Sequence, residues 1–213
     1  IDLDATMIKP KFNYFTIKQL KKLCNESNYF YKVLMWFMFD SGIRSPTELM
    51  NVKVSDLEWI EGFYSLNIRE ETSKTFGRRL KLMLCSDILK EYLSKKHFNP
   101  EDYIFKKEPH IVNQYLKRIG YKALQIGTVI TVDFQGRKCN QIRDGLSMYD
   151  FRHSSACYWL PRYKSESALK YRFGWKSSDK IHYYSELLGM SDTISEDDML
   201  VDVTRTELEQ KLE

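Results

Sequence analysis

The sequence lacks several features that would point to a metalloprotein or to a chain of many domains. Its four cysteines are far apart, form no C-x-x-C pair and have no histidine at zinc-ligand spacing, which argues against a structural metal site. We interpret them as reduced thiols of an intracellular protein. The 213 residues contain no internal repeat, low-complexity segment or Gly/Ser linker, so we expect one main domain.

Long apolar segments are also missing. The richest apolar stretch, residues 29–39, is interrupted by Lys32 and is too short to span a membrane. We therefore expect a buried helix there and a cytoplasmic protein without a membrane anchor. The chain begins with Ile1 rather than Met and has no charged leader followed by an apolar region, which indicates a fragment of a longer protein.

Positive and negative charges are nearly balanced along the chain. The formal net charge of +4 permits a polyanionic partner but does not identify one. The hydrophobic fraction of 43% and the aromatic fraction of 14% are those of a chain that folds around a core. The local arrangement of the charged residues must therefore carry any inference about function.

Helix signals dominate the chain. Thr16 and Gln19 match a capping box that begins a helix, and Gly42 is placed to end the next helix in a left-handed conformation. A second capping box, residues 45–48, predicts another helix directly after Arg44. The first two of these helices are expected at about residues 17–25 and 28–40. Further helices are expected at about residues 86–96, 109–118, 148–160, 165–173 and 179–188.

Strand signals are confined to two segments. Alternating apolar and polar residues within 63–84 predict two or three short antiparallel strands, with Lys74 in that small sheet. The segment 127–142 combines β-branched residues with a Gln-Gly turn and suggests a hairpin. The expected fold class is therefore α+β, mainly helical with a small antiparallel sheet.

Several polar residues have ordinary explanations when each is taken alone, such as Arg44 as a helix cap or Lys74 as a solvated side chain. Their order and spacing, however, resemble the catalytic boxes of the tyrosine recombinases, the phage-integrase family. Four segments carry the resemblance: "MFDSGIRSPTELMNVKVSDLEW" at 38–59, "TSKTFGRRLKLML" at 72–84, "YDFRHSSACYWL" at 149–160 and "FGWKSSDKIHYYSE" at 173–186. The expected fold is accordingly the catalytic-domain fold of that family.

The resemblance also selects between two adjacent tyrosines. In the family's final box the nucleophile follows the second residue of a G-H or G-W pair by nine positions, which selects Tyr184 over Tyr183 when counted from Trp175. Adjacent helical residues point about 100° apart, so Tyr183 is expected to pack or to form a wall of the pocket. "FGW" in place of the commoner "LGH" is most similar to integrases of archaeal mobile elements.

The chemistry implied by the resemblance is attack on a DNA phosphodiester. Two guanidiniums bind and neutralise the non-bridging oxygens, the tyrosine forms a 3′-phosphotyrosine link, and a lysine protonates the departing 5′ oxygen. The indole N–H of the tryptophan donates to a phosphate oxygen. No metal, ATP or other cofactor is required. The catalytic residues implied are Arg44, Lys74, Tyr149, Arg152, Trp175 and Tyr184.

One position departs from the family pattern. Tyr149 stands where the second box normally has a histidine, which leaves the proton-accepting base open because a phenol titrates poorly near neutrality. We expect His153 to have a packing or structural role. Arg78, Arg79 and Lys81 form either a solvated sheet face or phosphate contacts beside Lys74.

The resemblance implies a site-specific recombinase that integrates or excises a mobile element, acting on double-stranded DNA as a homo-oligomer that is tetrameric in the synaptic complex. It places the catalytic domain at 1–190 and a C-terminal tail, a candidate for docking on a neighbouring subunit, at 191–213. An N-terminal core-binding domain is expected to be absent from this fragment. The alternatives are a DNA-binding module of the same fold with impaired catalysis and a type IB topoisomerase.

Overall fold

The computed structural model describes residues 12–134 and 137–189. The elements along the chain are α1 (Ile17–Asn25), α2 (Tyr29–Ser41), η1 (Leu49–Asn51), η2 (Val54–Asp56), β1 (Leu57–Ile60), β2 (Phe63–Ile68), η3 (Glu70–Thr72), β3 (Arg78–Leu82), α3 (Ser86–Lys96), α4 (Pro109–Leu124), β4 (Thr128–Phe134), β5 (Arg137–Arg143), α5 (Met148–Trp159), η4 (Leu160–Arg162), α6 (Glu166–Phe173) and α7 (Asp179–Leu187). The predicted fold class, mainly helical with small antiparallel sheets, is confirmed.

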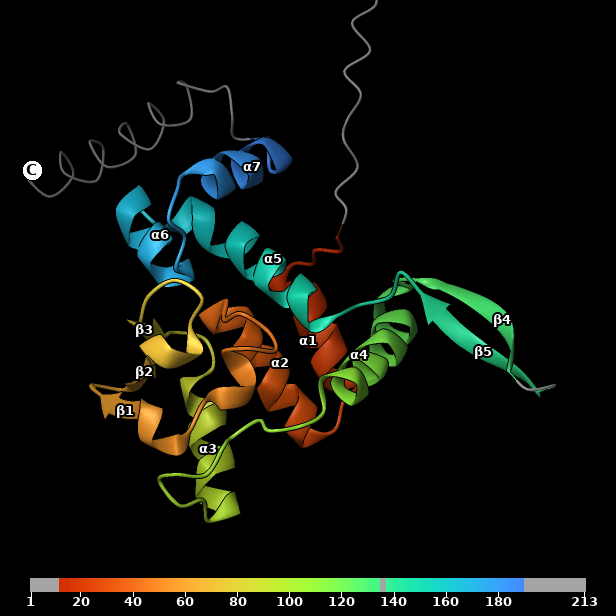
Figure 1. Ribbon diagram of the computed structural model, residues 1–213, viewed down its shortest axis with the longest axis horizontal. Helices are drawn as coiled ribbons and strands as arrows, with labels where there is room; N and C mark the ends of the chain where they lie inside the picture. The colour runs from red at the N-terminus through yellow and green to blue at the C-terminus, as the bar shows by residue number, and fades with distance from the viewer. Residues whose placement is uncertain (1–11, 135–136, 190–213) are drawn as a thin grey trace, which may run out of the picture.

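Helix α2 forms the centre of the core and is packed by α1, α3, α5 and β3 (Figure 1). The side chain of Asn28 accepts a hydrogen bond from the Tyr31 amide at 3.1 Å and begins the helix. Gly42 ends it with φ 59°, a left-handed conformation that glycine adopts without steric cost. The predicted core helix is thus confirmed, and its end fixes where the chain turns toward Arg44.

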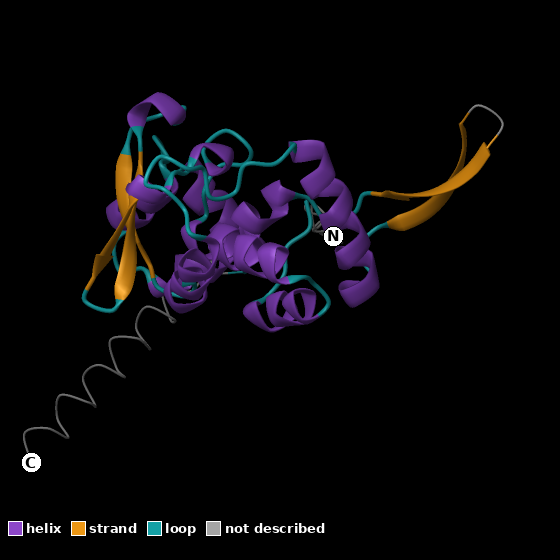
Figure 2. Ribbon diagram, turned by 90° about the horizontal axis from the view of Figure 1, so that it is seen from below, coloured by secondary structure: helices purple, strands orange, loops and turns teal. Residues whose placement is uncertain are grey.

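The three-stranded sheet has the order β1-β2-β3 and is antiparallel throughout. Along β3, Arg78, Leu80 and Leu82 are buried while Arg79 and Lys81 are exposed. This alternation is the period of a strand with one face on the core. Figures 1 and 2 place the sheet at one end of the molecule and the β4-β5 hairpin at the other.

The helix predicted after Arg44 is not formed. Residues 45–48 make a turn, and only the short 3-10 helix η1 follows. The carboxylate of Glu48, which the capping box assigned to the amide of Ser45, instead accepts a hydrogen bond from the amide of Arg44 at 3.0 Å. The prediction was wrong because Glu48 has stronger tertiary partners, which are described below.

The C-terminal helices are joined to the core by a buried ion pair. Arg172, near the end of α6, contacts the Asp40 carboxylate of α2 with 3.0 Å between Nη2 and Oδ1, and Trp159 of α5 donates its indole N–H to the Asp40 carbonyl at 2.9 Å. Because both ions are buried, removing one would leave the other uncompensated. The pair therefore fixes the segment that follows Arg172, which is Phe173 and Gly174.

The hairpin predicted at 127–142 is confirmed as β4 and β5, which pair from Thr128 opposite Arg143 outward. It follows α4 and precedes α5 in the chain and projects from the body (Figure 2). Most of the β5 side chains are exposed. Helix α4 is longer than the predicted 109–118 because its apolar face continues through Ile119 and Gly120.

Residues 1–11 and 190–213 lie outside the described residues. The predicted tail at 191–213, the boundary at 190 and the missing upstream domain therefore stay predictions. Within the described ranges, no helix combines the length and the apolar character needed to cross a membrane.

Candidate active site

Arg44 lies in the turn after α2 and reaches toward the segment that follows α6. Its Nη1 donates to Glu48 Oε1 at 2.8 Å, and its Nη2 donates to the carbonyl of Gly174 at 2.6 Å. The side chain is 14% exposed. The guanidinium is thus held from two sides and lies at the edge of the core, where an anion from solvent can approach it.

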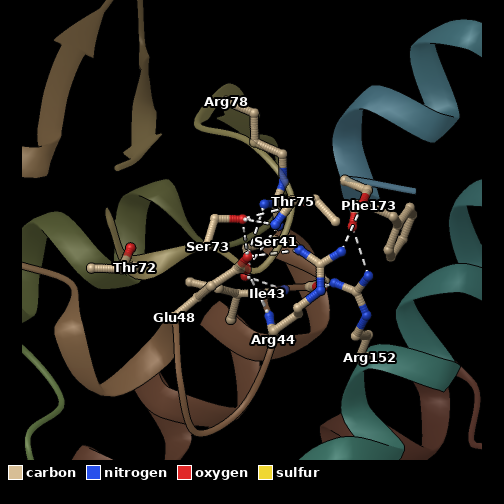
Figure 3. Close-up of polar contacts among 12 residues, drawn as sticks. Ser41, Ile43, Arg44, Glu48, Thr72, Ser73, Thr75, Arg78, Arg152 and Phe173 are labelled. Carbon is tan, nitrogen blue, oxygen red and sulfur yellow. Dashed lines mark hydrogen bonds and ion pairs between the residues drawn. The ribbon is translucent and has the colours of Figure 1, made fainter. Parts of the chain in front are cut away.

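Arg152 of α5 reaches the same segment, with its guanidinium beside that of Arg44 (Figure 3). Its Nη1 donates to the Gly42 carbonyl at 2.5 Å and its Nη2 to the Phe173 carbonyl at 2.6 Å. The two predicted arginines therefore bond to the carbonyls of consecutive residues, Phe173 and Gly174. Sequence positions 108 residues apart are brought together at one point.

The charges around Arg152 favour an anion. Burial, followed by the nearby guanidiniums of Arg44 and Arg78, lowers the pKa of Arg152 to about 10. Two cations that repel each other in a partly desolvated place are both stabilised when a negative group binds between them. A phosphate with two free oxygens has the charge and geometry to do so.

Glu48 organises this cluster and was not among the residues singled out from the sequence. Its carboxylate accepts hydrogen bonds from Arg44, from Ser73 Oγ at 2.9 Å and from both terminal nitrogens of Arg78 at 3.0 and 2.8 Å. Burial acts to raise the pKa of Glu48, but the hydrogen bonds and charge of Arg78 and the hydrogen bonds from Arg44 outweigh it and lower the pKa to about 2. The available signal was its position four residues after Arg44.

Arg78 corrects one prediction. Its side chain is fully buried and is bonded to Glu48 and, through Nε, to the Arg172 carbonyl at 2.9 Å. It is therefore neither a solvated residue nor accessible for direct contact with a DNA phosphate. Strand alternation placed it on the same face as Leu80 and Leu82, and that signal pointed to burial.

Lys74 is exposed and lies in the loop between η3 and β3 rather than in a strand. The loop is anchored before Lys74, since Ser73 donates to Glu48 at 2.9 Å, and Thr75 donates its amide back to Ser73 Oγ at 3.4 Å. Figure 3 shows Ser73 and Thr75 beside the arginine cluster. Lys74 thus lies between two residues that are close to the arginine cluster.

Tyr184 is buried on the inner side of α7, with 4% of its surface exposed, whereas Tyr183 is 38% exposed. The Tyr184 ring stacks on Trp175 with centroids 5.7 Å apart, and Trp175 stacks in turn on Phe173 at 4.6 Å. Burial raises the pKa of Tyr184, although the charge of Arg152 acts in the opposite direction. The ring of Tyr184 thus contacts Trp175, which directly follows the two residues, Phe173 and Gly174, whose carbonyls accept from the arginines.

His153 contacts the hydroxyl of Tyr184, with 2.5 Å between Nδ1 and Oη. The imidazole is stacked on Phe12 at 3.6 Å and meets the exposed Tyr149 edge to face at 4.8 Å. Burial, then the charges of Arg152 and Lys180, lowers the pKa of His153 to about 4. The expected structural role was therefore incomplete: its ring touches the predicted nucleophile.

The other two predicted DNA-contacting residues have exposed side chains. Arg79 forms an ion pair with Glu58 at 3.1 Å in which both side chains are largely exposed, and the Lys81 ammonium lies 4.5 Å from the ring centroid of Phe63. Exposed pairs of this kind are weak, so both cations can exchange these partners for phosphates.

Comparison with known proteins establishes the fold. No protein-family model matches the chain, and no curated protein matches it. Among solved structures it is similar to XerA recombinase, with a TM-score of 0.60 and 18% identity over 92% of this chain and 66% of that one. It is also similar to XerH recombinase bound to difH substrate, with a TM-score of 0.58 and 18% identity over 82% of this chain and 50% of that one.

A lambda integrase dimer bound to a core site matches with a TM-score of 0.56 and 18% identity over 83% of this chain and 48% of that one. The chain spans about half the length of the XerH and lambda integrase chains. The fold is that of the catalytic domains of tyrosine recombinases.

Proposed function

We propose that this chain is the catalytic domain of a site-specific tyrosine recombinase, which cuts and rejoins DNA through a 3′-phosphotyrosine intermediate. The observation that carries the proposal is the convergence of Arg44 and Arg152 on adjacent carbonyls, beside the ring that stacks on Tyr184. The fold supports it, since the same fold belongs to recombinases solved on their DNA substrates.

In the proposed reaction the scissile phosphate binds between Arg44 and Arg152. The Tyr184 oxygen attacks phosphorus, and the negative charge that develops on the non-bridging oxygens is stabilised by the two guanidiniums. Lys74 gives a proton to the departing 5′ oxygen, and the indole N–H of Trp175 donates to a phosphate oxygen. Tyr149 donates a hydrogen bond from its phenol at the rim. Rejoining is the reverse sequence and requires no cofactor.

The proposed substrate surface continues from Lys74 along the exposed face of β3. Arg79 and Lys81 project from that face, and we propose that they neutralise backbone phosphates. We also propose that the chain acts as a homo-oligomer and that a further domain contributes to DNA binding. The further domain is supported by XerH and lambda integrase, whose chains are about twice as long as the aligned part. The homo-oligomer is supported by the lambda integrase dimer bound to a core site.

A second candidate function is a DNA-binding module with impaired catalysis. Two observations favour it: the hydroxyl of Tyr184 is buried and bonded to His153, and Tyr149 replaces the histidine of the family pattern. Such a module would bind duplex DNA, with the strong salt dependence of phosphate contacts, and would not form a covalent link.

The test is a covalent-capture experiment with the purified chain. A library of nicked duplexes with a randomised core is used because the target sequence is unknown, and adducts are recovered under denaturing conditions. The wild type and Tyr183→Phe are expected to form an adduct, and Tyr184→Phe is expected to form none. Duplex binding without any adduct by the wild type would instead establish the binding module.

A further inference from the structure

His153 is the described side chain that forms a hydrogen bond with the predicted nucleophile. Its Nδ1 lies 2.5 Å from Tyr184 Oη and joins α5 to α7 across 31 residues of sequence. The imidazole is held on one face by Phe12, nearly parallel at 9°, and is met by Tyr149 at 78°. A ring fixed in this way presents one nitrogen to the hydroxyl.

Burial, and after it the nearby positive charges, lower the pKa of His153 and keep this imidazole neutral. Arg152 from α5 and Lys180 from α7 are the cations that act on it, and the phenols of Tyr149 and Tyr184 are the other titratable groups in ring contact with it. A neutral imidazole has one nitrogen that can accept a proton. With Nδ1 in that state, the Tyr184 hydroxyl is the donor.

We propose that His153 is the general base that accepts the hydroxyl proton of Tyr184, an inference that rests on the proposed recombinase function. The family pattern has one histidine at the position of Tyr149 and a second directly after its arginine, at the position of His153. Residues four apart lie on the same face of a helix, so His153 lies on the same face of α5 as Tyr149, one turn further along.

The proton and bond changes balance. The bond from Tyr184 Oη to phosphorus forms as the bond from phosphorus to the 5′ oxygen breaks; the hydroxyl proton passes to His153 Nδ1, and Lys74 protonates the leaving oxygen. A phosphate bound to Arg152 offsets the positive charge that disfavours imidazolium. Substrate binding therefore raises the pKa of His153 at the moment when a base is needed.

The experiment compares single-turnover rates of adduct formation on a duplex recovered from the capture experiment. His153→Asn keeps a hydrogen-bonding group near the position of Nδ1 but cannot act as a base, and it is expected to react about 10² to 10⁴ times more slowly. His153→Ala is expected to be equally slow and to be accelerated by added imidazole. His182→Asn, at an exposed position of α7, is the matched control and should react at the wild-type rate.

The pH profile separates a base from a structural contact. The wild-type rate is expected to fall as pH decreases and His153 becomes protonated, and this acidic limb should be absent in His153→Asn. Thermal unfolding and duplex binding of each variant show whether it is folded. If a folded His153→Asn or His153→Ala reacts as fast as the wild type or faster, the contact only holds the resting tyrosine and the proposal is overturned. Failure of the wild type to form any adduct would instead overturn the proposed function itself.

Discussion

At the scale of single residues, Glu48 determines the arrangement of the arginine cluster. Its carboxylate is buried and accepts from Arg44, Arg78 and Ser73, which come from three different parts of the chain. A buried carboxylate is stable only when its partners compensate the lost hydration. The same carboxylate therefore fixes both the Arg44 turn and the loop that bears Lys74.

We expect Glu48→Gln to destabilise the protein and to change its pH dependence. The folded pKa of Glu48 is lowered from 4.5 to about 2, so its stabilising effect is fully present above pH 4.5 and is lost as pH falls toward 2. This shift in pKa means that ionised Glu48 contributes on the order of 3 kcal/mol to the free energy of unfolding. Urea unfolding should show the difference between wild type and variant shrinking from about pH 6 to about pH 2.

The matched control for this prediction is Glu58→Gln. Glu58 pairs with Arg79 in an ion pair whose side chains are 58% and 62% exposed, so its loss should change the free energy of unfolding by less than about 1 kcal/mol. A Glu48→Gln protein as stable as this control at neutral pH would show that the buried cluster contributes nothing net.

At the scale of elements, the end of α2 is packed closely against the end of α6. A Cβ added at Gly42 would lie 2.3 Å from Cε1 of Phe173, and the Gly42 carbonyl is an acceptor for Arg152. The end of α2, the ring of Phe173 and the side chain of Arg152 therefore pack against one another. Only glycine both adopts the left-handed backbone without strain and leaves free the space that the Phe173 ring fills.

Gly42→Ala is expected to lower the free energy of unfolding by about 3 kcal/mol or more, because it adds overpacking to the strain of a positive φ. Gly62→Ala is the matched control: Gly62 has φ 94° with nothing within 4 Å of an added Cβ, so the variant should lose only about 1 to 2 kcal/mol. Chemical denaturation of both proteins measures the difference. Equal losses would mean that the contact with Phe173 relaxes without cost.

At the scale of the whole molecule, the β4-β5 hairpin is an appendage on an otherwise continuous body (Figure 2). Each strand pairs with the other along its length, and the described contacts with the body are mainly those between β5 and α4 at the base. An isolated two-stranded hairpin contributes little stability. The core should therefore fold without the outer part of it.

We expect replacement of residues 130–141 by Asn-Gly, which closes the pair of Val129 and Ile142 with a tight turn, to leave the midpoint of thermal unfolding within about 3 °C of the wild type. Leu116→Ala in α4, where Leu116 is fully buried, should cost about 2 to 5 kcal/mol and a clearly larger shift. A hairpin deletion as damaging as Leu116→Ala would show that the hairpin belongs to the core.

The sequence was informative wherever a local interaction decides the structure. The capping box at Thr16 and Gln19 forms as predicted, and the glycine end of α2 does too. The similar box at residues 45–48 failed because Glu48 bonds to Arg44 and Arg78, which no local pattern describes. Arg78 was predicted to be accessible although strand alternation put it on the same face as Leu80 and Leu82. Its partner Glu48, 30 residues away, is a contact that no local pattern describes.

In the candidate site, too, some features were predicted from the sequence and others depend on contacts between distant residues. The resemblance of four sequence segments to the recombinase boxes predicted Arg44, Arg152 and Tyr184 as members of one site, and the structure brings them to one region. The contact of His153 with Tyr184 was not predicted, because it joins two helices through a ring orientation set by Phe12 and Tyr149.

By itself, the sequence determined the helices, the strands and the residue types available for phosphate chemistry, because hydrogen bonds and side-chain periodicity act between near neighbours. Only the tertiary structure decided which arginine is buried, which carboxylate holds the cluster and which ring touches Tyr184. Those outcomes depend on desolvation and packing among side chains far apart in the chain, where a buried charge takes whatever partner the fold brings to it.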